Sequence, residues 1–166
     1  MGTGRFITVK LDPFYQEFLR GQFNWYDPVF TFPKGHDLLK RLEYYLTVPP
    51  KDFKLDDFGE ETFRIEIPRM EHKDPDCYTF LSEQKNKLFA NAVRDYYRVI
   101  FHAEIGKAIK DGIPKSDMIF CLMDDYNISR DYEDRIIKDF DRYLKSERLR
   151  RYRRRNRKIL RERVKK

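Results

Sequence analysis

SEQKNKLFANAVRDYYRVIFHAEIGKAIKDG, from Ser82 to Gly112, is one long helical pattern near the middle of a 166-residue chain. Ser82 can cap the helix, although Lys85 takes the place of the acidic residue that would complete a capping box. Gly112 is expected to end it. Apolar residues recur at helical spacing, and the buried stripe is predicted to comprise Leu88, Phe89, Ala92, Val93, Tyr96, Val99, Ile100 and Ile105. Strand and helix patterns alternate before this helix, and helical patterns follow it.

On its N-terminal side, the clearest strand signal is the strict alternation of Phe63, Ile65 and Ile67. A helix is expected to open at Asp12-Pro13, because aspartate can cap a helix and proline suits its first turn. The predicted strands are Arg5–Leu11, Pro28–Lys34, Thr62–Pro68 and a short fourth one within Cys77–Leu81. The predicted helices are Pro13 to about Gly21 and the amphipathic run His36–Leu46, which Pro49-Pro50 ends.

The charge of the chain is concentrated at its C-terminus. KSERLRRYRRRNRKILRERVKK, Lys145 to Lys166, holds 13 of the 35 basic and 2 of the 28 acidic residues, a net charge of +11. Residues 1–144 therefore hold 22 basic and 26 acidic residues, a net charge of −4. A block of like charge usually binds an anionic polymer or surface.

These patterns predict an α+β fold in three parts. A small mixed N-terminal part, residues 1–81, would supply the core and a dimerisation or partner surface; a helical, helix-turn-helix-like part spans 82–144; and a basic C-terminal helix spans 145–166. No apolar run could cross a membrane, and the N-terminus lacks a secretory signal. Cys77 and Cys121 favour reduced thiols in a cytoplasmic protein, with a disulfide as the alternative. Cys121 is expected in the core.

A pair of helices is predicted after Gly112. Lys115–Tyr126 would form a short helix, and Ile128 could plug the gap before a second helix capped by Ser129. The segment MIFCLMDDYNISRDYEDRIIKDFDRY, within residues 113–143, resembles the helix-turn-helix of small regulators from phages and other mobile elements, such as the Mor-type activators. The resemblance implies a dimeric, sequence-specific DNA-binding protein whose second helix enters the major groove.

The first turns of that second helix carry both signs of charge. The groove-facing candidates are Arg130, Arg135 and Lys138. Asp131, Glu133 and Asp134 lie beside them, and carboxylates near phosphates are unfavourable unless they accept from cytosine amino groups. Either the acidic residues face away from DNA, or the pair is an ordinary αα-hairpin.

The basic C-terminal segment is the second candidate for binding. Arginine forks match phosphate oxygens, and the predicted phosphate contacts are Arg148, Arg150, Arg151, Arg153, Arg154, Arg155, Arg157, Lys158 and Arg161. Contact with roughly six to eight phosphates corresponds to a slope of log K against log salt of roughly −5 to −7. Leu149, Tyr152, Asn156 and Ile159 are spaced for a short coiled-coil seam, although the positive charge of two chains would oppose it.

The sequence thus predicts a non-enzymatic DNA-binding protein of a phage or mobile element, with DNA preferred over RNA, a homodimer left open, and no membrane, metal or cofactor. One alternative is a packaging or virion protein whose tail holds nucleic acid without sequence preference. Another is a magnesium-dependent nuclease of the PD-(D/E)xK kind, since Asp76 precedes Glu83-Gln84-Lys85, with Glu66 or Glu71 upstream. The histidines, His36, His72 and His102, lack the spacing of a zinc site.

Overall fold

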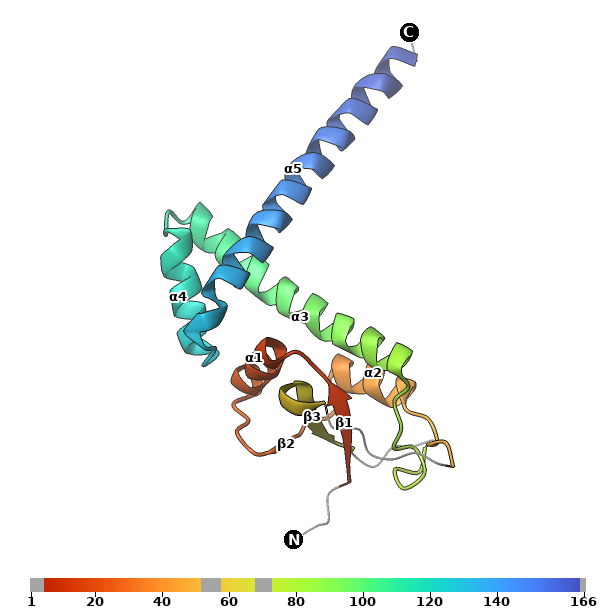
Figure 1. Cartoon of the computed structure of the whole chain (residues 1–166). Coiled ribbons are helices and arrows are strands. Elements are labelled where there is room, and N and C mark those ends of the chain that lie inside the picture. The colour runs from red at the N-terminus through yellow and green to blue at the C-terminus, as the bar shows by residue number, and fades with distance from the viewer. Residues whose placement is uncertain (1–4, 52–57, 68–72, 165–166) are drawn as a thin grey trace.

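The computed structural model describes residues 5–51, 58–67 and 73–164, with side chains as far as residue 154. Its elements are β1 (Phe6–Lys10), α1 (Pro13–Phe23), β2 (Val29–Phe30), α2 (Asp37–Tyr45), β3 (Thr62–Glu66), α3 (Glu83–Lys110), α4 (Lys115–Asp125) and α5 (Glu133–Val164), with short 3-10 turns at Gly59–Glu61 and Arg130–Tyr132. The predicted α+β class is confirmed. Figure 1 shows α3 crossing the molecule, the sheet and α2 near its N-terminal end, α4 near its C-terminal end, and α5 extending away from the rest.

The sheet has the strand order β1-β3-β2, antiparallel between β1 and β3 and parallel between β3 and β2. The strict alternation in the third predicted strand is confirmed, since Phe63, Ile65 and Ile67 are all buried. The strand predicted over Pro28–Lys34 shortens to Val29–Phe30. It lies between Pro28 and Pro33, which have no backbone N–H to donate to a sheet. In the fourth predicted strand, Phe80 forms one isolated bridge with Thr47.

The first helix begins as predicted but runs further. Asp12 accepts a hydrogen bond from the Phe14 N–H, and Pro13 occupies the first turn. Gly21 does not end the helix, which continues to Phe23 and is capped by Asn24 in a left-handed conformation. Gly21 instead packs directly against the backbone of Tyr126, at the end of α4.

The buried face of α3 differs from the predicted stripe. The buried residues are Phe89, Val93, Tyr97, Phe101, Ile105 and Ala108, whereas Leu88 is exposed and the exposed fraction of Val99 is 71%. Tyr96 and Ile100 are half-buried at the edge of the core. Apolar residues occur all round this helix, so spacing alone could not decide which face the other elements would cover.

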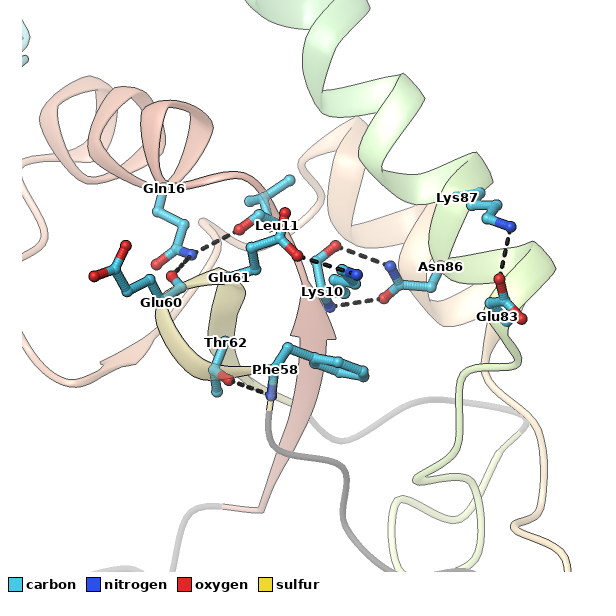
Figure 2. A network of polar contacts seen from close by, with 10 residues as sticks. All are labelled: Lys10, Leu11, Gln16, Phe58, Glu60, Glu61, Thr62, Glu83, Asn86 and Lys87. Atoms are coloured by element: carbon cyan, nitrogen blue, oxygen red, sulfur yellow. Dashed lines mark hydrogen bonds and ion pairs between the residues drawn. The ribbon is translucent and has the colours of Figure 1, made fainter. Parts of the chain in front are cut away.

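Two side chains tie the sheet to the neighbouring helices (Figure 2). The Asn86 side chain accepts from the Lys10 N–H at 2.9 Å and donates to the Lys10 carbonyl at 2.8 Å. Gln16 Nε2 donates to the carbonyls of Leu11 and Glu60, at 2.7 and 2.8 Å. Asn86 therefore pairs with backbone groups on the outer edge of β1, where an unpaired strand would invite another chain.

The buried side chains of the first two predicted parts, 1–81 and 82–144, form one continuous cluster from Ile7 to Phe140. Cys121 is not in it. The prediction that this residue packs in the core is wrong, because α4 buries Ile119, Leu122 and Met123 and turns Cys121 to solvent. Cys77 is also exposed, and both thiols are free. Within the described residues, we find no helix with the length and apolarity to cross a membrane.

Candidate nucleic-acid interface

The predicted helix pair is present as a structural unit. α4 ends at Asp125, Asn127 takes a left-handed conformation with φ of 50°, and Ile128 is buried in the turn between the helices. The Ser129 hydroxyl accepts from the Asp131 N–H at 3.4 Å. The Ser129 N–H donates to Glu17 of α1 at 2.8 Å, so the turn is held against the N-terminal part. Whether the pair meets DNA stays a prediction.

Two of the three groove-facing candidates are engaged within the chain. Arg135 donates to the Asp12 carboxylate at 2.8 Å and lies over the rings of Phe14 and Tyr15. Arg130 donates to Asp124 at 2.5 Å and lies 3.4 Å from the centre of the Phe120 ring. We do not retain Arg135 as a base contact, because its guanidinium is turned to the cap of α1.

The third candidate, Lys138, is exposed and forms an ion pair with Asp134 one turn earlier, at 3.5 Å. Asp134 and Asp131 are exposed, so this surface presents carboxylates to solvent as well as lysine. The acidic residues therefore do not turn into the core. This surface is poorly suited to close approach by a phosphate backbone.

The position of Arg135 leads to a stability prediction. Arg135→Ala should lower the free energy of unfolding by about 1–2 kcal/mol, because it removes both an ion pair and a cation–π contact that join α5 to α1. Urea denaturation followed by circular dichroism would measure the change. Lys138→Ala is the matched control on the same helix, and it should stay within about 0.5 kcal/mol of the parent. Equal effects of the two substitutions would contradict the structural role of Arg135.

Beyond the body of the molecule (residues 5–144), most of the described basic side chains of α5 are exposed and unpaired. Arg148, Arg151, Arg153 and Arg154 are exposed and form no ion pair with any described side chain. Arg150 pairs with Glu147 at 2.9 Å. The remaining predicted phosphate contacts are Arg155, Arg157, Lys158 and Arg161, which belong to α5 but whose side chains lie outside the described part. Leu149 and Tyr152 are also exposed, so the described part of the coiled-coil seam is uncovered.

A polar cluster that the sequence patterns did not reveal lies where α5 crosses α3. Arg98 donates two hydrogen bonds to the Asp139 carboxylate, at 2.5 and 3.2 Å. His102 Nε2 lies 3.0 Å from the same carboxylate, and its ring stacks on Tyr143 at 4.3 Å. These residues line an open hollow of about 710 Å³, together with Arg142, which forms no ion pair with any described residue. In the sequence, the spacing of Asp139 and Tyr143 places them one turn apart on the same face of α5. Nothing in that spacing indicated that this face would contact α3.

The charge of Asp139 is strongly stabilised. Burial opposes ionisation of this carboxyl group, but the hydrogen bonds from His102 and Arg98 outweigh burial and hold its pKa well below the ordinary value. The hydrogen bond to Asp139 in turn raises the pKa of Arg98. The cluster therefore keeps a carboxylate and a guanidinium charged together at the crossing of the two helices.

This arrangement predicts a pH-dependent contribution to stability. Because the folded pKa of Asp139 is depressed, its contribution is complete above the unfolded pKa of about 3.9 and declines as the pH falls towards the folded value. The gap in urea midpoint between the parent and Asp139→Asn should thus be widest near neutral pH and narrow below about pH 4. Asp141→Asn is the control, because Asp141 is exposed and pairs with Lys115 at the surface. A gap that is constant with pH would refute the prediction.

The residues of the nuclease alternative do not converge. Asp76 pairs with Arg5, Glu83 pairs with Lys87, and Glu66 accepts from the Thr31 hydroxyl. Among residues 5–51, 58–67 and 73–154, no three His, Cys, Asp or Glu side chains gather as metal ligands would. Glu71 and His72 lie outside the described residues.

The strongest candidate for a functional surface is therefore the arginine-rich length of α5 together with the hollow at its base. Comparison of this chain with protein-family models, with curated proteins and with solved structures gave no match.

Proposed function

We propose that this protein binds nucleic acid, without catalysis, through phosphate contacts along α5. The observation that carries the proposal is the group of exposed arginines, most of them unpaired, on a helix that extends away from the body (Figure 1). Such a helix gives several guanidinium forks access to a phosphate backbone at once. No stretch of the described body carries a comparable density of basic side chains.

Phosphate contact is favoured over reading of base edges. A base contact needs a free donor at the start of the second helix, and there Arg130 and Arg135 are held by Asp124 and Asp12. Further along α5, Arg148, Arg151, Arg153 and Arg154 form no ion pair with any described side chain. This balance favours binding with little sequence preference, as a packaging or assembly protein would need.

The experiment is a salt titration of the full chain with a fluorescent duplex of random sequence. We expect the logarithm of the binding constant to fall with the logarithm of salt concentration at a slope of roughly −5 to −7, for roughly six to eight neutralised phosphates. A slope near zero, or no binding at low salt, would overturn the proposal.

A sequence-specific regulator of a phage or mobile element is the second candidate, supported by the α4–α5 pair with Ile128 buried in its turn. It predicts a preferred site in a random duplex library and a loss of that preference in Lys138→Ala. Lys138 is the suitable probe, because its side chain is exposed and its replacement leaves the α1 contact of Arg135 intact.

A further inference from the structure

The hollow at the base of α5 continues across α3. A second open hollow of about 480 Å³ lies between α3 and the start of α2. The two share Asp95 and Val99 on their walls, so they adjoin on one face of α3. Together they form a continuous track from α5, over α3, to α2, which we call the α3 track.

The lining of the α3 track changes along its length. At the α5 end lie Arg142 and the stacked pair of His102 and Tyr143. At the α2 end lie Arg41 and the ring pair of His36 and Tyr96, whose centres are 5.2 Å apart.

The middle of the track is apolar apart from the Asp95 carboxylate. Val99 has an exposed fraction of 71%, and Ala103 beside it is also exposed. Arg142 and Arg41, at opposite ends, form no ion pair with any described residue. Unpaired cations therefore mark both ends of a surface whose centre is apolar apart from Asp95 and whose flanks are aromatic.

We propose that the α3 track holds a single-stranded segment of nucleic acid, entering from α5 and leaving past α2; this inference rests on the proposed function of α5. Unpaired bases present flat apolar faces that stack on rings, and their backbone needs cations at intervals. The rings at both ends and the apolar centre suit such bases, while Arg142 and Arg41 suit the phosphates. A duplex keeps the faces of its bases stacked inside, so they are not free to stack on the rings of this surface.

Three acidic residues line the track. Asp139 is paired with Arg98 and Asp37 with Lys40, whereas Asp95 opposes this ligand and provides the sharpest test. The Asp95 side chain is largely exposed and lies 4.0 Å from the Arg94 Nε atom, too far for strong neutralisation. A phosphate crossing α3 would be repelled by this carboxylate. Asp95→Asn should therefore tighten binding of a single strand, which is the opposite of what loss of a structural residue does.

The experiment measures binding of the full chain to fluorescent deoxythymidine and uridine oligomers of about 20 nucleotides, several times the smallest site of a single-strand binder, and to a duplex of equal length. We expect Asp95→Asn to bind the single strands about fivefold more tightly and Arg41→Gln about fivefold more weakly, with the duplex nearly unchanged. A change in the binding of both oligomers, or of either one, supports the proposal, and the difference between them shows whether the deoxythymidine or the uridine strand is preferred.

Two matched controls lie on α3 outside the track. Glu104→Gln removes the same charge as Asp95→Asn, but from the opposite face of α3. Lys107→Gln removes an exposed positive charge. Both should change single-strand binding by less than about twofold, since they act only through distant, screened charge.

The outcomes separate the two proposals. Equal effects of Asp95→Asn and Glu104→Gln on the single strands, with binding of the parent intact, would overturn the α3 track and leave the function of α5 standing. Failure of the parent to bind any of the three probes would overturn both.

Discussion

Gly21→Ala is expected to lower the free energy of unfolding by about 3 kcal/mol, at the upper end for overpacked sites. A Cβ atom on Gly21 would overlap the Tyr126 carbonyl group and lie 2.7 Å from its Cα atom. No rotamer change can relieve this overlap, because every atom involved belongs to the backbone or is the Cβ itself. Helix α1 and the α4–α5 turn would have to separate.

That separation would break contacts that hold the helix pair to the N-terminal part. The Ser129 N–H donates to Glu17 at this junction, and the Phe18 ring stacks on Tyr126 with centres 5.6 Å apart. Thermal unfolding should report a fall in midpoint of roughly 6–12 °C for a chain of this size.

Gly106→Ala is the control for this substitution, with an expected change of opposite sign. Gly106 lies within α3, and a Cβ there would meet no atom within 4 Å. Alanine should stabilise that helix by about 0.5–1 kcal/mol, through its higher helix propensity and a smaller loss of chain entropy. If both substitutions were neutral, the close approach of α1 to Tyr126 would be refuted.

The largest expected effect on binding comes from removal of the free charges of α5. A variant with glutamine at four positions, Arg148, Arg151, Arg153 and Arg154, should reduce the steepness of the salt dependence by about 3.6, at about 0.9 for each lost phosphate contact. Binding to duplex DNA at about 100 mM salt should weaken by at least about 100-fold. Fluorescence anisotropy at several salt concentrations measures both quantities, and circular dichroism verifies the fold.

The matched control loses the same number of positive charges, but from the body instead of α5. Glutamine replaces four exposed lysines of the body, Lys34, Lys51, Lys107 and Lys110. Its salt dependence should stay within about one phosphate contact of the parent, because screening over about 10 Å leaves distant charges with little influence. Similar losses in the two variants would mean that net charge alone drives binding, and the specific role of α5 would fail.

The local elements were largely predictable from the sequence, because caps, turns and periodicity depend on residues only a few positions apart. Asp12 and Ser82 cap their helices as predicted, the strand with Phe63 alternates into the core, and Ile128 is buried between two helices. The basic C-terminal segment was likewise evident from composition alone, and its backbone is helical to Val164.

The tertiary structure decided which faces of these elements are used. Helix α3 carries apolar and aromatic residues on all its faces. Only the packing of other elements against it places Tyr97 and Phe101 in the core and leaves Val99 in solvent. The tertiary structure also decided which charged side chains form ion pairs. The chain separates Arg135 from Asp12 by more than a hundred residues, and Arg98 from Asp139 by about forty, so no local pattern could pair them.

For this protein, then, local chemistry along the chain determined the secondary structure and the place of its positive charge. The assignment of each charged side chain to a structural or a solvent-facing role came only with the fold, because an ion pair depends on where two distant segments meet. Arg135 became a tie between helices, and the α3 track arose from three helices that are separate in sequence. The side chains that stayed free are Arg148, Arg151, Arg153 and Arg154.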